Sequence, residues 1–110
     1  MTLKLRKMGC DFMEEKDRHV SDCGNYRLRA EFTDKNGKHV IADFSGGRIW
    51  NDLCVDASYY DENGICHPYS PLEQAVNYTY GKYWRYRLKT IMHAVNSVSA
   101  EQYDDVEVIE

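Results

Sequence analysis

The stretch NYRLRAEFTDKNGKHVIADFS, residues 25–45, decides the fold. Apolar side chains alternate with polar ones along residues 26–33 and again along the return run, which is the two-residue period of a half-buried β-strand. Between the two runs lies Asn36-Gly37, a strong short-range signal of a hairpin turn. The stretch therefore predicts an antiparallel hairpin with one apolar face.

Two turn geometries give this hairpin different registers. A two-residue Asn-Gly turn sets Phe32 opposite Ile41 and mixes polar and apolar side chains on each face. A three-residue loop, residues 35–37 with Gly37 left-handed in a bulge, gives one clean apolar face, and we expect this loop. Its register pairs Phe32 with Val40, Ala30 with Ala42, Leu28 with Phe44 and, on the outer face, Arg29 with Asp43.

A second hairpin follows, because the turn TDKNGK at residues 33–38 is answered by YDENGI at residues 60–65. Alternation through Leu53 to Tyr60 predicts a third strand, and a short return through Ile65 and Cys66, ended by Pro68, predicts a fourth. The strands that flank the two turns do not match. We therefore interpret the recurrence as shared turn chemistry and not as an internal repeat.

The second half of the chain predicts helices. In SPLE, residues 70–73, Ser70 is the expected N-cap, Pro71 the first helical residue and Glu73 the partner in a capping box. Gly81 breaks or bends this helix. From Lys82 to Val98 the spacing of apolar residues predicts the main amphipathic helix. Its apolar seam comprises Trp84, Leu88, Ile91, Val95 and Val98.

Together these elements predict the fold class. DDVEVIE, residues 104–110, indicates a last strand at a sheet edge, while residues 2–8 alternate like a strand and the acidic segment after them is equally consistent with a surface loop. We expect a single α+β domain over residues 1–110. Its antiparallel sheet has two hairpins plus a C-terminal strand, with one main amphipathic helix packed on one face.

Composition bounds the environment of the chain. Its first ten residues are basic, but no apolar segment follows them and no window approaches the length of a membrane span. We therefore expect a soluble, cytoplasmic protein without membrane association. Two disulfides could join the four cysteines, but in that compartment reduced thiols are expected. The cysteines are Cys10, Cys23, Cys54 and Cys66.

Neither a metal site nor a catalytic motif is indicated. Structural zinc sites usually show ligands about two to four residues apart, and here only Cys66 and His67 stand close together. Adjacent residues on a strand point to opposite faces, so this pair is badly placed for proton transfer. Gly46-Gly47 lacks the spacing of a phosphate-binding loop. We expect no metal, no cofactor and no enzymatic activity.

A basic, aromatic segment, YTYGKYWRYRLK at residues 78–89, raises the question of nucleic-acid binding. On the predicted helix Lys82, Arg85 and Lys89 form one stripe with Tyr86 beside it, which suits phosphates and a stacked base. However, the chain carries a net charge of −4, whereas nucleic-acid-binding domains usually are basic. A small DNA- or RNA-binding accessory protein is therefore the alternative function.

Tyrosines beside acidic residues favour protein binding. The chain has nine tyrosines, and tyrosine is enriched at interfaces because it offers a large area with few rotors and a polar tip. The rival interpretation is that these rings merely cover a small sheet. We expect the acidic residues to fit a basic cleft of the partner, because a row of carboxylates resembles a row of phosphates in charge. The predicted partner-binding residues are Asp52, Asp56, Tyr59, Tyr60, Asp61, Glu62 and Tyr69.

Two segments carry a resemblance to known proteins: NYRLRAEFTDKNGKHVIADF at residues 25–44, and AVNSVSAEQYDDVEVI at residues 94–109. In these the chain resembles small accessory proteins of phages and conjugative elements, some of which are anti-CRISPR inhibitors. Such inhibitors share no common fold, so no site residue follows. The resemblance implies a compact phage or mobile-element protein that binds a larger partner. The leading hypothesis is a non-enzymatic inhibitor that masks the nucleic-acid-binding or catalytic surface of a host CRISPR nuclease.

Overall fold

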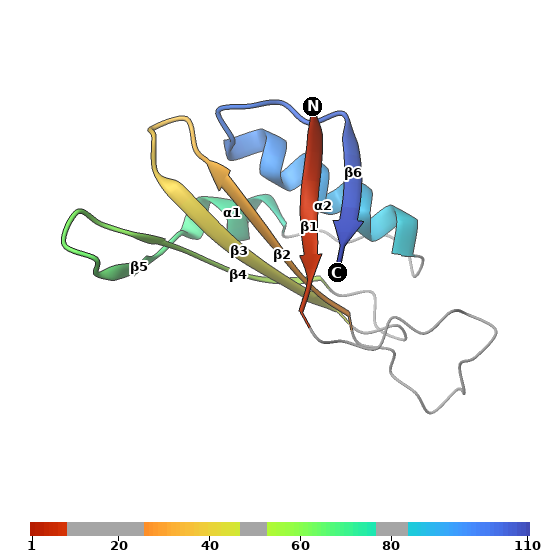
Figure 1. Ribbon diagram of the computed structural model, residues 1–110, viewed down its shortest axis with the longest axis horizontal. Coiled ribbons are helices and arrows are strands. Elements are labelled where there is room, and N and C mark those ends of the chain that lie inside the picture. The colour runs from red at the N-terminus through yellow and green to blue at the C-terminus, as the bar shows by residue number, and fades with distance from the viewer. Residues whose placement is uncertain (9–25, 47–52, 77–83) are drawn as a thin grey trace.

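The computed structural model describes residues 1–8, 26–46, 53–76 and 84–110. These ranges form one mixed sheet and two helices (Figure 1). In chain order the elements are β1 (Thr2–Lys7), β2 (Tyr26–Thr33), β3 (His39–Gly46), β4 (Cys54–Tyr60), β5 (Cys66–Pro68), α1 (Ser70–Ala75), α2 (Trp84–Val98) and β6 (Asp105–Ile109).

The sheet has six strands in the order β5-β4-β3-β2-β1-β6. The strands from β5 to β1 are antiparallel to their neighbours, and β2–β3 and β4–β5 are the two expected hairpins. The last pair differs, because β6 lies parallel to β1 at the edge. The α+β class and the terminal edge strand are confirmed. The expectation of a purely antiparallel sheet is wrong, because the last strand, β6, pairs with β1 in the parallel direction.

The register of the β2–β3 hairpin is the one predicted from the three-residue loop. Phe32 lies opposite Val40, and Arg29 lies opposite Asp43. Gly37 has a φ of 85°, a left-handed conformation that a residue with a Cβ rarely adopts. The Arg29 Nε donates to Asp43 Oδ1 at 2.8 Å on the outer face. Both side chains are partly exposed, so this ion pair adds only a fraction of a kcal/mol.

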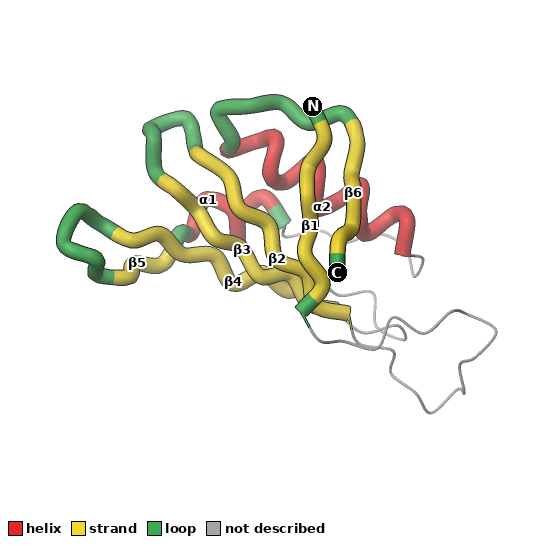
Figure 2. The backbone as a smooth tube through the Cα atoms, viewed as in Figure 1, coloured by secondary structure: helices red, strands yellow, loops and turns green. Residues whose placement is uncertain are grey.

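Both helices lie on one face of the sheet (Figure 2), and the hydrophobic core lies between the helices and the sheet. Along β1, β2 and β3 every second side chain faces the helices and is almost fully buried, as are Ile91 and Val95 of α2. Leu88 and Val98 pack against this core with part of their surface exposed, which confirms four members of the predicted seam. The fifth, the Trp84 side chain, lies outside the described residues.

The first helix begins one residue earlier than predicted. Tyr69 is the N-cap residue, and no side chain caps α1, so the expected capping box of Ser70 and Glu73 is wrong. Pro71 stands in the first turn, where its missing N–H is harmless. In the described ranges no helix is both long enough and apolar enough to cross a membrane.

Candidate functional site

The two turns with similar sequences have the same hydrogen bonds. In the β2–β3 turn the Asp34 N–H donates to the Lys38 carbonyl at 2.8 Å, and the Gly37 N–H donates to the Asp34 carbonyl at 3.1 Å. Oδ1 of Asp34 accepts the backbone N–H groups of Asn36 and Lys38 at 2.9 and 2.8 Å. Asp34 therefore makes the hydrogen bonds that join the two strand ends and also those that fix the backbone of the loop.

Asp61 repeats these contacts in the β4–β5 turn. Its N–H donates to the Ile65 carbonyl at 3.0 Å, and its Oδ1 accepts the N–H groups of Asn63 and Ile65 at 2.8 and 3.0 Å. Gly64 has a φ of 76° and donates to the Asp61 carbonyl. The interpretation of the recurrence as shared turn chemistry is confirmed.

The second carboxylate oxygen distinguishes the two turns. Oδ2 of Asp34 accepts a buried hydrogen bond from the Tyr69 hydroxyl at 2.9 Å. Oδ2 of Asp61 lies 2.7 Å from Nε2 of His67, in a pair that solvent reaches. The His67 contact is the largest cause that lowers the pKa of Asp61, followed by the N–H of Ile65. Within the described residues, the Asp34 carboxylate therefore joins the first turn to the core, whereas the Asp61 carboxylate contacts residues of its own hairpin.

The β4–β5 hairpin carries apolar side chains that are not covered. In the described part of the chain the exposed large hydrophobic residues are Tyr60 (59%), Ile65 (56%) and Met1 (61%). Tyr60 and Ile65 flank the β4–β5 turn, and Glu62 is exposed within it. Asp56 is exposed on β4, in the same alternation as Tyr60, and so on the face opposite the helices. Ile65 stands opposite Asp61 and two residues before His67, so it projects from the other side of the hairpin, and Tyr60 and Ile65 come together only at its end. We call Asp56, Tyr60, Glu62 and Ile65, which surround this end, the hairpin surface.

Tyr59 faces the other way and stiffens this hairpin. Its ring stacks on His67 with centroids 5.2 Å apart, and the Lys38 Nζ lies 4.6 Å from its centroid. The ring also meets Tyr69 edge to face at 6.4 Å. Tyr59 is half-buried in these contacts, so it stiffens the hairpin and is not counted as a member of the hairpin surface.

Tyr69 corrects a prediction. We expected its ring at the surface, but it is 5% exposed, lies in the core and donates to Asp34. Burial, and then the hydrogen bond to Asp34, raises the pKa of Tyr69 to about 12. The phenol is therefore neutral and acts as a donor that joins the start of α1 to the first turn.

The other predicted site residues divide between the described and undescribed parts of the chain. Of the protein-binding set, Asp52 lies outside the described residues. Asp61 lies in the β4–β5 turn, where its carboxylate bonds to Asn63, Ile65 and His67 and so has a structural role. Of the alternative nucleic-acid set, Lys82 lies outside them, and Arg85 and Tyr86 stand on α2 with side chains that are not described. Lys89 is exposed on α2.

Sequence reasoning missed two contributors to this site. The sequence pattern predicts Ile65 only as a strand residue, although an isoleucine directly after a turn has few neighbours to cover it. It places His67 beside Cys66, whereas the observed partner of His67 is Asp61 across the turn. Alternation along β5 is the signal that places His67 on the same face as Tyr59, its neighbour in the register.

Within the described ranges, no group of three or more His, Cys, Asp or Glu side chains is arranged to hold a metal ion. Cys54 and Cys66 are free thiols at the surface, while Cys10 and Cys23 lie outside those ranges. No protein-family model, curated protein or solved structure matches the chain.

Proposed function

We propose that this protein is a non-enzymatic binding protein that docks its hairpin surface into a basic cleft of a larger protein. The observation that carries the proposal is the exposure of Tyr60 and Ile65 on either side of one turn, beside Glu62. Elsewhere the outward positions of the strands are mainly polar. Apolar side chains gathered at a protruding turn are typical of interface anchors, because a partner removes them from water.

The two anchors supply part of the free energy that specific binding requires. Burying a large apolar side chain stabilises a complex by about 1.5 to 3 kcal/mol. The turn is already fixed by the hydrogen bonds to Asp61 and by the stacked rings of Tyr59 and His67. Binding therefore needs little further ordering of the backbone, which otherwise weakens association.

Charge supports a basic partner. Asp56 and Glu62 flank the apolar anchors, and the chain has a net charge of −4. A cleft that binds nucleic acid is lined with Lys and Arg, and acidic groups beside an aromatic ring match such a lining. The resemblance to accessory proteins of phages and mobile elements makes a host CRISPR nuclease the first partner to test. In this proposal the protein acts in the cytoplasm and masks the nuclease surface that holds nucleic acid or cleaves it.

A direct test compares equivalent positions of the two turns. The double variant Tyr60→Ser/Ile65→Ser removes both anchors. Thr33→Ser, the first-turn variant, changes the exposed position that matches Tyr60 and leaves Lys38 in contact with the Tyr59 ring. Each chain is added to a purified CRISPR nuclease loaded with guide RNA, and both binding and DNA cleavage are measured. We expect the wild type and the first-turn variant to bind the nuclease and inhibit cleavage, and the anchor variant to do neither.

The same chains serve as baits in a lysate of a host that carries such a nuclease. Loss of one specific protein from the anchor variant alone supports the proposal. Recovery of nucleic acid without a protein partner contradicts it and favours the alternative function, nucleic-acid binding through the predicted stripe of Lys82, Arg85, Tyr86 and Lys89. Equal capture by the anchor variant and the wild type shows that the hairpin surface is not the interface.

A further inference from the structure

A second surface lies at the opposite edge of the sheet, along β6. Among the described residues the strand order ends on β6, which pairs with β1 and has no strand of these ranges on its other side. Alternate residues of a parallel strand bond to one neighbour, and the residues between them point their N–H and carbonyl groups the other way. The Val106 N–H donates to the Asp105 carboxylate at 2.8 Å, which indicates that Val106, and with it Val108, points away from β1.

The side chains of β6 differ between its two faces. Val106 and Val108 lie opposite Leu3 and Leu5, and both are half-buried against the core. Asp105 and Glu107 are exposed on the other face. A strand added to this edge would extend the core with aliphatic side chains on one face and would meet carboxylates on the other.

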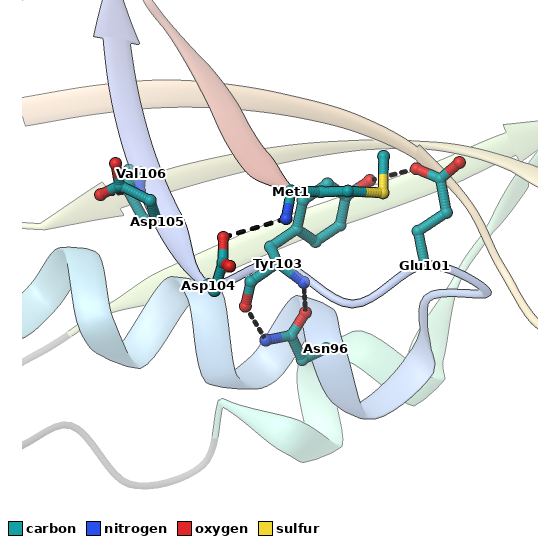
Figure 3. A network of polar contacts seen from close by, with 7 residues as sticks. All are labelled: Met1, Asn96, Glu101, Tyr103, Asp104, Asp105 and Val106. Atoms are coloured by element: carbon teal, nitrogen blue, oxygen red, sulfur yellow. Dashed lines mark hydrogen bonds and ion pairs between the residues drawn. The ribbon is translucent and has the colours of Figure 1, made fainter.

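The edge is also held in place before any partner arrives. The N-terminal amine of Met1 donates to Asp104 at 2.9 Å, and Lys7 donates to Glu110 at 3.3 Å (Figure 3 shows the first of these). Asn96 of α2 holds the segment before β6 through two hydrogen bonds of 2.8 Å to the backbone of Tyr103 (Figure 3). A fixed edge loses little entropy when a strand is added.

We propose that the outer edge of β6, which no other strand of the described ranges covers, binds an extended segment of a partner protein in which aliphatic residues alternate with Lys or Arg. Main-chain hydrogen bonds supply affinity in such strand addition, and alternate side chains supply specificity. A second copy of the chain fits poorly, because pairing β6 with itself sets Asp105 and Glu107 against the same carboxylates. The opposite edge is less suited to strand addition, since β5 spans only Cys66–Pro68 and ends in proline.

The probe for this proposal is a capped peptide of about six alternating Val and Lys residues, long enough to cover the five residues of β6. Its binding to the isotope-labelled full chain is followed by NMR. We expect shifts of the β6 amides that weaken as salt is raised, and no such shifts with a peptide of alternating Val and Glu. No shifts at millimolar peptide, or shifts elsewhere in the sheet, overturn the proposal.

Two variants sharpen the test. Val108→Pro removes an outward N–H without touching the ladder to β1, so we expect the shifts to disappear while the rest of the spectrum is retained. Ser70→Pro is the control, because Ser70 is the exposed first residue of α1, where proline is tolerated, and we expect it to keep peptide binding. Glu107→Lys should weaken binding of the Val-Lys peptide and admit the Val-Glu peptide, a result that does not depend on tolerance of proline.

Analytical ultracentrifugation tests the rival occupant. A chain that stays monomeric as its concentration rises supports a foreign segment as the occupant. Self-association that Val108→Pro abolishes shows that a second copy fills the edge and overturns the proposal. These outcomes are independent of the hairpin surface, which lies beyond β4 at the other end of the sheet.

Discussion

The Tyr69 hydroxyl donates to Oδ2 of Asp34 at 2.9 Å, and this contact joins the residue before α1 to the β2–β3 turn. Both residues are buried, with 5% and 2% of their surface exposed. Oδ1 of the same carboxylate accepts two backbone N–H groups of the turn. One aspartate therefore couples the local geometry of a loop to the packing of a helix on the sheet.

Tyr69→Phe should lower the free energy of unfolding by about 1 to 3 kcal/mol, because it leaves one oxygen of a buried carboxylate without its donor. Urea unfolding of both chains measures the difference. Tyr60→Phe is the matched control. Tyr60 is 59% exposed, so we expect removal of its hydroxyl to change the free energy of unfolding by less than about 0.5 kcal/mol. Equal effects would show that the Asp34 contact is no stronger than an exposed one.

Stability should fall in acid through Asp34. Burial opposes the ionisation of Asp34, but hydrogen bonds from the Lys38 N–H, Tyr69 and the Asn36 N–H outweigh it, so the pKa is lowered from 3.8. A depressed pKa in the folded state contributes stability above the unfolded value, and this contribution is lost as pH falls through the folded one. Thermal unfolding should be followed as the pH falls below 3.8. The melting temperature of Asp34→Asn should decline less steeply in this acidic range than that of the wild type.

Stability should also fall in alkali, through Tyr69. Its pKa is raised from 10.0 to about 12, because burial and the Asp34 carboxylate disfavour the phenolate. A raised pKa contributes stability that is complete below pH 10 and is lost as pH rises toward 12, because the unfolded chain releases its proton first. Urea unfolding in this interval should show a weaker pH dependence for Tyr69→Phe, and an unchanged dependence would contradict the burial of the phenol.

The β2–β3 hairpin was predictable from sequence because its determinants are local. Gly37 and the alternation on either side of it allow one register with a clean apolar face, and that register is observed. The same logic gave β4 and the helix seam through Ile91 and Val95. In each case the apolar residues recur every two residues in a strand, or every three or four in a helix, and this spacing can be recognised within a single element.

Long-range pairings were not predictable in this way. The parallel pairing of Leu5 with Val108 joins the two ends of the chain, and no local pattern records it. The environment of Tyr69 was misjudged for the same reason, because the acceptor of its hydroxyl lies 35 residues away. Ile65 was placed correctly after a turn, but its exposure depends on how far the hairpin extends beyond its neighbours.

Gly37→Ala and Gly64→Ala should each destabilise the fold by about 1 to 2 kcal/mol, because both glycines have positive φ values. An added Cβ would meet nothing within 4 Å at either position, so the cost is conformational and not steric. Asparagine tolerates this conformation better, and Gly→Asn at either site should cost less. Thermal unfolding of the four variants checks the order, which an equal effect of Ala and Asn would contradict.

Ile91→Ala should cost about 2 to 5 kcal/mol, because Ile91 is fully buried between α2 and the sheet. Lys89→Ala, on the exposed face of the same helix, should change stability by less than about 0.5 kcal/mol. The difference in urea midpoint between these neighbours measures how firmly α2 packs. A midpoint shift for Ile91→Ala no larger than that for Lys89→Ala would contradict the packing of this face.

Asp34→Ala and Asp61→Ala remove the same carboxylate from two turns of the same geometry, yet they should act on different scales. Loss of the Asp34 carboxylate leaves the buried Tyr69 hydroxyl without its acceptor, and it should lower the stability of the whole sheet. Loss of the Asp61 carboxylate breaks contacts with Asn63, Ile65 and His67 that lie within one partly exposed hairpin. Its effect should therefore be local opening of the β4–β5 turn, with the melting temperature nearly retained.

Native-state amide hydrogen exchange separates the two cases. Asp61→Ala should speed exchange at Asn63 and Ile65 alone, because their N–H groups lose the Oδ1 acceptor, whereas Asp34→Ala should speed it throughout the strands. If Asp61→Ala also speeds exchange in β1 and β2, the β4–β5 hairpin unfolds together with the core and is not an independently opening unit.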